Sequence, residues 1–162
     1  MTKPFKGSTY GETTLRGIDT LINEFKEHFN NPDSVFYDLG SGKGDMVIYV
    51  ASNTPVKKSC GIELHKERFD ISQEKLNKLS LDNVSFLNED FLESDISDAT
   101  IIYIDNLLIP DDVQTQLWEN IPDGALVIST LKLKEKDSIK YRSTKKPIRR
   151  SYANLKSLYT IK

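Results

Sequence analysis

The residues best suited to chemistry are an acid and three glycines that follow a short apolar run. Val35-Phe-Tyr37 leads into Asp38, and Gly40, Gly42 and Gly44 come directly afterwards. An apolar run, a glycine turn and an amphipathic segment in this order are typical of a buried strand, a tight loop and a helix. Gly40 and Gly42 would let the backbone approach a ligand closely, because no Cβ intervenes. The first N–H groups of the helix are expected to face that ligand.

Asp38 favours a cationic ligand at this loop over a phosphate. A carboxylate at the end of the strand would repel a phosphate and attract a positive group. S-adenosyl-L-methionine combines a nucleoside with a sulfonium and an α-ammonium group, so it fits a glycine loop beside an acid. The spacing Gly-x-Gly-x-Gly also differs from the Gly-x-Gly-x-x-Gly of dinucleotide-binding proteins, which disfavours a nicotinamide-dependent oxidoreductase.

Two further acids follow β-like runs and suit the nucleoside part of such a ligand. Glu63 ends the run that begins at Lys57. At this place in nucleotide-binding sheets an acid accepts hydrogen bonds from the ribose hydroxyls. Asp90 and Phe91 follow the next run, where Asp90 could accept from the adenine amino group and Phe91 could stack on the ring. The plainer interpretation is a solvated acid in the first case and a loop acid beside a core aromatic in the second.

Asp105 and Asn106 are the candidate catalytic residues. They follow the run Thr100–Ile104, at the position where an α/β sheet usually meets its second substrate. Their oxygens can orient an amine, and the Asn amide adds donors. Leu107-Leu-Ile109 comes next, in place of the Pro-Pro-aromatic sequence of enzymes that methylate base amino groups. The alternative is an ordinary turn at the end of a strand.

Alternating strands and helices are expected to position these residues. This order indicates a single doubly wound, mostly parallel α/β sheet of the Rossmann-like type, with helices on both faces. The carboxyl ends of its strands would bring the four acids to one edge. The pattern predicts helices over residues 15–29 (capped by Thr13 or Thr14), 44–52, 66–79 and 111–120, strands over 35–37, 57–63, 84–87, 100–104 and 125–131, and one or two closing strands within 151–161.

Length and charge describe one domain with a basic end. The 162 residues suit a single domain, with residues 1–9 as a flexible lead-in and 132–150 as a basic loop. Residues 131–162 carry a net charge of +9, whereas residues 1–130 carry −11. The basic end is either a solvated loop or a docking site for nucleic acid or an acidic protein face. The residues expected to make that contact are Lys145, Lys146, Arg149 and Arg150.

Composition disfavours several other classes. No apolar stretch is long enough to span a membrane, and residues 1–10 lack the apolar core of a signal peptide. We therefore expect an intracellular protein, cytoplasmic or nuclear, with no membrane partner. The single Cys60 excludes an internal disulfide and a cysteine-based zinc site, and His28 and His65 lack the spacing of metal ligands. We expect no metal, and the sequence does not indicate an oligomeric state.

Taken together, the motifs resemble the class I S-adenosylmethionine-dependent methyltransferases. Within these the chain is most similar to the disruptor-of-telomeric-silencing family of nucleosomal histone lysine methyltransferases. The resemblance covers about residues 9–131 and implies that Tyr10, Glu12 and Thr13 close over the methionine end of the cofactor. The segments that carry it are Tyr10-Gly-Glu-Thr13, Asp38-Leu-Gly-Ser-Gly-Lys-Gly44, Gly61-Ile-Glu63, Asp90-Phe91 and Asp105-Asn106. The cofactor residues it implies are Tyr10, Glu12, Thr13, Asp38, Gly40, Ser41, Gly42, Glu63, Asp90 and Phe91.

This chain departs from the family mainly in the residues expected to bind the methyl acceptor, and less in those expected to bind the cofactor. The family has Asn-Asn-Phe where this chain has Asp105-Asn106-Leu107, and its larger N-terminal helical region has no counterpart in these residues. The resemblance implies methyl transfer to a protein lysine, as on a histone. An RNA or small-molecule methyltransferase, and a cofactor-binding adaptor without turnover, are the alternatives.

Overall fold

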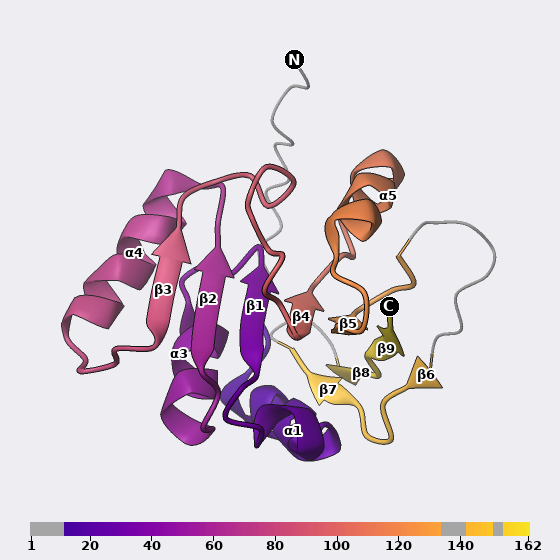
Figure 1. Cartoon of the computed structure of the whole chain (residues 1–162), viewed down its shortest axis with the longest axis horizontal. Helices are drawn as coiled ribbons and strands as arrows, with labels where there is room; N and C mark the ends of the chain where they lie inside the picture. The colour runs from indigo at the N-terminus through magenta and orange to yellow at the C-terminus, as the bar shows by residue number, and fades with distance from the viewer. Residues whose placement is uncertain (1–11, 134–141, 151–153) are drawn as a thin grey trace.

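The computed structural model describes residues 12–133, 142–150 and 154–162, which form a central sheet with helices on both faces (Figure 1). The main sheet has seven strands in the order β3-β2-β1-β4-β5-β9-β6. Their bounds are β1 (Val35–Leu39), β2 (Lys58–Ile62), β3 (Val84–Leu87), β4 (Ile101–Ile104), β5 (Leu126–Ser129), β6 (Arg142–Ser143) and β9 (Leu158–Ile161).

The predicted doubly wound, mostly parallel sheet is confirmed. β3, β2, β1, β4 and β5 pair in parallel, and β9 pairs antiparallel with both β5 and β6. The strand order reverses between β1 and β4, because β2 and β3 lie on one side of β1 while β4 and β5 lie on the other. Ligands of such sheets bind outside the carboxyl ends of the strands at this switch point.

The helices begin where local chemistry predicts them. Thr14 caps the first helix, and its Oγ1 accepts a hydrogen bond from Gly17 N at 3.1 Å. The predicted helix over residues 15–29 is divided at Phe25 into two helices. Asp45 lies in the first turn of the third helix, where a negative charge suits the helix dipole. The helices are α1 (Leu15–Glu24), α2 (Lys26–Phe29), α3 (Asp45–Asn53), α4 (Lys66–Asn77) and α5 (Asp111–Asn120).

Alternating side chains of the strands build a core on each face of the sheet. Phe36 and Ile101 belong to a cluster with residues of α1 and α3, whereas Tyr37 and Ile102 belong to a second cluster that includes Leu117 of α5. A fully buried side chain of this size contributes about 1.5–3 kcal/mol. Because both faces are covered, the strands read as continuous apolar runs.

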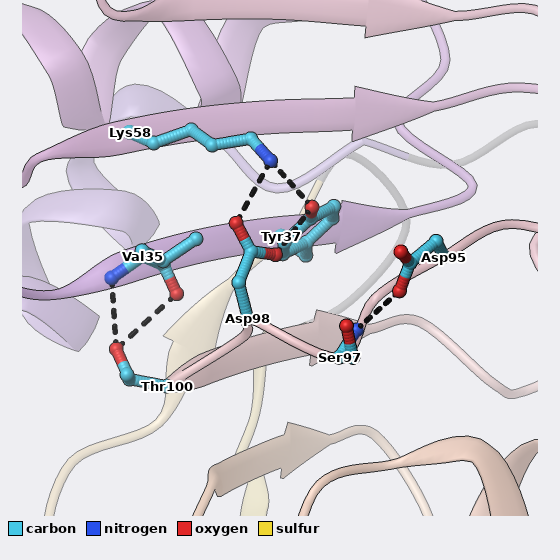
Figure 2. A network of polar contacts seen from close by, with 7 residues as sticks. All are labelled: Val35, Tyr37, Lys58, Asp95, Ser97, Asp98 and Thr100. Atoms are coloured by element: carbon cyan, nitrogen blue, oxygen red, sulfur yellow. Dashed lines mark hydrogen bonds and ion pairs between the residues drawn. The ribbon is translucent and has the colours of Figure 1, made fainter.

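A polar network fixes three strands in register at the end opposite to the predicted site (Figure 2). Lys58 Nζ of β2 donates to Tyr37 Oη of β1 at 2.6 Å and lies 3.1 Å from Asp98 Oδ2. Tyr37 Oη donates to Asp98 Oδ1 at 2.7 Å, and Thr100 Oγ1 accepts from Val35 N at 2.8 Å. Asp98 and Thr100 precede β4, so these bonds fix the register of β1, β2 and β4 at their N-terminal ends. The carboxyl ends of the three strands are aligned as a result.

The C-terminal part is more ordered than the predicted basic loop. Within residues 142–150 lie β6 and β7 (Ile148–Arg149), and β7 pairs antiparallel with β8 (Asn154–Leu155). Residues 1–9 and 134–141, which belong to the predicted lead-in and loop, lie outside the described part of the chain. The predicted closing strands are confirmed by β8 and β9. No helix within the described ranges is long and apolar enough to cross a membrane.

Candidate active site at the carboxyl edge of the sheet

The glycine loop after β1 is packed tightly against the end of β2. Gly40 and Gly42 have φ values of 85° and 55°, in the left-handed region that favours glycine. A Cβ on Gly61 would lie 2.5 Å from Ser41 Oγ and 2.7 Å from Phe86 Cδ1. Glycine at this position of β2 therefore allows the loop to lie directly over the strand.

The N–H groups of the loop point back into the protein. Those of Gly40 and Ser41 both donate to Ile62 O, at 2.8 and 3.0 Å, and that of Gly42 donates to Glu63 Oε2 at 2.8 Å. These three loop N–H groups are therefore bonded within the protein, whereas the first N–H groups of the helix, which were predicted to face the ligand, belong to α3 and its start at Asp45. A phosphate at this loop would find them already bonded, so the loop differs from a phosphate cradle.

Asp38 is a buried carboxylate with no hydrogen bond or ion pair among the described residues. Its residue is only 6% exposed. Burial, which is the largest cause, and the negative charges of Glu63 and Asp105 together raise the pKa of Asp38 to about 8. A cation placed beside Asp38 would reverse this effect, because it favours the ionised carboxylate.

A narrow cavity of about 40 Å³ lies at the carboxyl ends of β1 and β4. Tyr103 of β4 reaches it, and its hydroxyl lies 2.8 Å from Thr13 Oγ1, which ties the segment before α1 to the sheet. A cavity of this size holds one end of a nucleoside ligand, so the remainder would lie along the open edge. Its lining consists of Glu12, Thr13, Asp38, Gly40, Ser41, Gly42, Asp45, Met46, Tyr103 and Asp105.

Glu63 lies just behind this cavity at the end of β2. The residue is 4% exposed, and its carboxylate accepts from Gly42 N at 2.8 Å and from His65 N at 2.9 Å. These two bonds fix its orientation. Each carboxylate oxygen retains a further lone pair, so Glu63 can still accept hydroxyl donors.

Asp90 and Phe91 lie beyond β3, away from the cavity lining. Asp90 Oδ1 accepts from Leu92 N at 2.9 Å, so its side chain stabilises the local turn. Phe91 is half-buried and packs against the core cluster that contains α5. Both residues stand at the same edge of the sheet as Glu63, which is where the nucleoside roles place them.

Asp105 has a partner on each of its carboxylate oxygens. Thr130 Oγ1 donates to Oδ1 at 2.7 Å, and Arg150 Nε lies 3.8 Å from Oδ2. The side chain of Asp105 is 25% exposed, whereas that of Arg150 is 0% exposed. Burial raises the pKa of the neighbouring Tyr103 to about 12; the charge of Arg150 opposes this and that of Asp105 adds to it.

Asn106 does not reach the cavity, so the prediction that it contacts the acceptor is wrong. The residue is 0% exposed. Its Nδ2 donates to Gln114 Oε1 and Leu131 O, both at 3.0 Å, and its Oδ1 accepts from Leu131 N at 2.8 Å. The donor and acceptor groups that suggested catalysis are used to join the end of β4 to α5 and to the segment after β5.

The structure brings several of the predicted cofactor residues together and adds others. Glu12, Thr13 and Asp38 line one cavity, although they come from separate segments. Tyr10 lies outside the described residues. Tyr103 was not predicted, and Arg150 was predicted only as a contact for a polyanion. The signal for Tyr103 was its position on β4 two residues before Asp105, which directly follows that strand, so that both side chains lie on one face. Nothing local in the sequence pointed to a place for Arg150 beside Asp105.

The basic residues expected to form one docking surface do not all lie on the surface. Lys145, Lys146 and Arg149 are exposed, but Arg150 is only 3% exposed and faces Asp105. The prediction that Arg150 contacts a polyanion is therefore wrong. Within the described ranges, no group of three His, Cys, Asp or Glu side chains is arranged to hold a metal ion.

The comparison with protein families decides which family the chain represents. The model of the family described as "Histone methylation protein DOT1" matches residues 2–159. The chain belongs to the DOT1 family. The resemblance to the disruptor-of-telomeric-silencing family that the motifs predict is thereby confirmed, and the parallel sheet with its glycine loop is the methyltransferase fold of that family.

Two relatives of this DOT1-family chain are named as lysine methyltransferases. The H3 lysine-79-specific histone-lysine N-methyltransferase of Caenorhabditis elegans is 30% identical over 161 residues, which cover 88% of this chain and 17% of that protein. The protein-lysine N-methyltransferase of Saccharolobus islandicus is 30% identical over 99 residues, covering 60% of this chain and 62% of that protein. The chain thus spans only a small part of the nematode relative.

A solved structure shares the fold. The RNA methyltransferase from Salinibacter ruber in complex with S-adenosyl-L-homocysteine superimposes with a TM-score of 0.64 and 23% sequence identity. The match covers 88% of this chain and 86% of that one, so the likeness extends over almost the whole of both chains.

Proposed function

We propose that this protein is an S-adenosylmethionine-dependent methyltransferase that methylates a lysine amine of a protein substrate. The observation that carries the proposal is Asp38, a buried carboxylate without a cationic partner among the described residues, beside a loop whose amides are already bonded. This combination suits a nucleoside ligand that carries positive charge and no phosphate. Membership of a histone methylation family and the relatives that modify protein lysines support the same assignment.

The residues around Asp38 fit such a cofactor. Ser41 Oγ is buried and has no hydrogen-bond partner among the residues that the structure describes, although it lines the cavity. A buried hydroxyl without a partner costs about 1–3 kcal/mol, which a polar ligand group in the cavity would recover. We assign Asp38, Gly40, Ser41 and Gly42 to the methionine part, and call this the donor end of the cavity.

The other assignments extend along the edge of the sheet. Glu63 would accept from the ribose hydroxyls, Asp90 from the adenine amino group, and Phe91 would stack on the ring. Glu12 and Thr13 would close over the methionine part, with Tyr10 as a further candidate outside the described residues. Thr13 is held for this role by its contact with Tyr103.

The acceptor would approach at Asp105, which we call the acceptor end of the cavity. When bound, S-adenosylmethionine supplies a methyl group on a sulfonium, so that the amine lone pair forms a C–N bond while the C–S bond breaks and its electron pair stays on sulfur. A lysine amine has an ordinary pKa near 10.4 and must first lose a proton to solvent. Asp105 would orient the neutral amine as a hydrogen-bond acceptor, while Tyr103 and Met46 narrow the cavity and limit water.

The proposal is tested with labelled S-adenosylmethionine. The protein is incubated separately with core histones, nucleosomes, total lysate protein and RNA, and the labelled product is identified by mass spectrometry. Label on protein lysine is the expected result. Label only on RNA would favour the RNA methyltransferase alternative, and cofactor binding without label in any pool would favour the adaptor.

Two substitutions separate the binding of the cofactor's ribose from the role of the acceptor end. Glu63→Ala should weaken S-adenosylhomocysteine binding by about 1–3 kcal/mol, because charge-assisted hydrogen bonds are lost. Asp105→Ala should lower turnover much more than cofactor affinity. If Asp105→Ala binds cofactor poorly and otherwise methylates normally, Asp105 belongs to the donor end instead.

The basic surface formed by Lys145, Lys146 and Arg149 supports a contact with nucleic acid during this reaction. Lys145 and Lys146 line a surface hollow of about 610 Å³ together with Lys26, Glu24 and Glu27, so lysines outnumber glutamates in its lining. A nucleosomal substrate would present DNA phosphates next to its histone lysines, and phosphate contacts of this kind are salt-dependent.

The salt dependence of DNA binding tests this contact. Changing Lys145, Lys146 and Arg149 together to Gln should flatten the log–log salt slope by up to about three units, since each phosphate contact contributes nearly one. Changing the exposed Lys57 and Lys78 to Gln is the matched control and should leave the slope unchanged. If the unmodified protein shows no salt-dependent binding to DNA, these three residues are a solvated surface and do not contact nucleic acid.

A further inference from the structure

Arg150 is a buried guanidinium that reaches the acceptor end from the C-terminal part of the chain. Its Nη1 donates to Ile148 O at 3.3 Å and its Nη2 donates to Ser157 Oγ at 2.7 Å. Its Nε lies 3.8 Å from Asp105 Oδ2. The guanidinium is thus fixed on one side by the C-terminal segment and faces the candidate catalytic carboxylate on the other.

The backbone around Arg150 is held as firmly as its side chain. Thr13 and Arg150 form an antiparallel bridge, and Thr14 N donates to Arg149 O at 2.9 Å. A Cβ on Gly17 would lie only 2.3 Å from Arg149 O, which shows how closely α1 packs on this strand. The position of Arg150 relative to Asp105 is therefore set by the fold.

The charge of Arg150 matters because the rest of the cavity is acidic. Among the described residues that line the cavity none is cationic, and Glu12, Asp38, Asp45 and Asp105 all contribute carboxylates. Asp45 has its own partner elsewhere, since Lys75 Nζ lies 2.6 Å from its Oδ1. Glu63 and the Tyr103 phenol also face this region, from the neighbouring strands β2 and β4.

An unbalanced carboxylate would be a poor partner for a lysine nucleophile. A negative charge within about 4–6 Å stabilises the ammonium form, which has no lone pair with which to attack. A carboxylate whose charge is offset by a guanidinium can still accept a hydrogen bond from an amine, yet it favours the ammonium form much less.

We propose that Arg150 is a positioning residue that offsets the charge of Asp105, so that the acceptor end receives the lysine amine in its neutral form. This inference rests on the proposed lysine methylation and adds the feature that suits the site to a neutral amine. It gives the C-terminal segment a role in the reaction, although that segment lies far from the cofactor motifs in sequence.

The inference is tested by a double-mutant cycle read as a pH profile. The variants are Arg150→Met, Asp105→Asn and the double variant, each assayed for kcat at saturating substrate from about pH 6 to 10 with the histone preparation that the unmodified protein methylates, because kcat reports the ionisation of the bound lysine. For Arg150→Met the rise in kcat should move to higher pH by about one unit, giving roughly tenfold lower kcat near pH 7.5. In the Asp105→Asn background the same Arg150 change should cause no such shift.

A second measurement does not depend on turnover. A peptide that contains the acceptor lysine, in its unmethylated form, is titrated into the complex of the protein with S-adenosylhomocysteine. The titration is done in two buffers with different ionisation enthalpies, which gives the number of protons released. The unmodified protein should release about one proton per lysine bound near pH 7.5, and Arg150→Met should release close to none. Arg150→Lys keeps the positive charge and should restore most of the release.

The possible outcomes separate this inference from the proposed function. If the unmodified protein methylates no protein lysine, the proposed function fails and the inference fails with it. If it does methylate lysine, but Arg150→Met retains the original pH profile and proton release, only the Arg150 inference fails. An equal loss of activity at every pH, present also in the Asp105→Asn background, would make Arg150 a purely structural residue and would likewise overturn the inference.

Discussion

Asp38 and Asp105 line the same cavity from adjacent strands, yet their electrostatic surroundings are opposite. Asp38 lies near the carboxyl end of β1, is 6% exposed and has no cation beside it in the described part of the chain. Asp105 follows β4, accepts a hydrogen bond from Thr130 and faces the buried Arg150. The donor end therefore holds a carboxylate that lacks a counter-ion, and the acceptor end holds one that already has it.

This difference indicates which kind of group each end is suited to receive. A cation supplied by a ligand is favourable at Asp38, because it relieves the burial of an unbalanced charge. A second cation at Asp105 is less favourable, because Arg150 already offsets that carboxylate. The arrangement suits a reaction in which a positively charged donor meets a neutral nucleophile.

The largest expected effect comes from removing the charge at the donor end. Asp38→Asn should weaken S-adenosylmethionine binding by about 10–100-fold, because a hydrogen bond or ion pair to a charged group contributes about 1.5–3 kcal/mol. Isothermal calorimetry measures the change. Asp98→Asn is the matched control, since Asp98 lies in the network at the other end of the strands and should affect stability but leave affinity unchanged. If Asp38→Asn and the unmodified protein bind S-adenosylmethionine with equal affinity, the charge of Asp38 does not attract the ligand and the proposed difference between the two ends is wrong.

The second prediction disturbs the acceptor end without changing a polar side chain. Alanine usually stabilises a helix by about 1 kcal/mol relative to glycine. Gly17→Ala should instead destabilise the protein by about 1–3 kcal/mol, because the new Cβ would meet Arg149 O at 2.3 Å. The displaced strand carries Arg150, so turnover should fall more than cofactor affinity. Chemical denaturation gives the free energy of unfolding, and a stabilised Gly17→Ala variant would show that α1 and β7 are not closely packed.

Local pattern was enough to predict the donor end. Asp38, the glycine loop and Glu63 each lie within a few residues of the strand that positions them, so strand ends and glycine spacing predicted their placement. The sheet followed from the same alternation of elements. The partners of the loop amides, Ile62 O and Glu63, were not predicted, because they come from the end of β2 and the residue after it.

The acceptor end was harder to predict because its partners are distant in sequence. Asn106 has the right functional groups for catalysis, but they bond to Gln114 and Leu131. Arg150 belongs to a run of basic residues, and charge alone suggested a solvated side chain. Its burial results from the bridge to Thr13 and the packing of β7 on α1, which no local pattern encodes.

The third prediction uses pH to test the unbalanced carboxylate. The pKa of Asp38 is raised to about 8, above its ordinary value near 3.9 in an unfolded chain. The ligand-free fold should therefore lose stability as pH rises from about 4 to 8, since only the unfolded chain ionises readily there. A cationic ligand needs the ionised form, so affinity for S-adenosylmethionine should rise by up to about tenfold per pH unit below about 7.5.

Calorimetry at several pH values checks this dependence, with Asp38→Asn as the control that should remove it. Above about pH 7.7 the α-amino group of the ligand begins to lose its own proton, so the informative range lies below that value. A flat affinity in the unmodified protein between about pH 5.5 and 7.5 would mean that Asp38 is already ionised before the ligand arrives.

The smallest expected effect concerns Ser41, which tests whether the donor end recognises the ligand by hydrogen bonding as well as by charge. Ser41 Oγ is buried without a partner and lines the cavity, so a hydroxyl that gains a partner only on ligand binding should contribute about 0.5–1.5 kcal/mol. Ser41→Ala should weaken S-adenosylhomocysteine binding by roughly two- to tenfold while leaving the ligand-free protein equally or slightly more stable, because an unpartnered buried hydroxyl is removed. Thermal unfolding with and without ligand measures both quantities. Lower stability of the ligand-free variant together with unchanged affinity would show that the hydroxyl serves the loop and that charge alone defines the donor end.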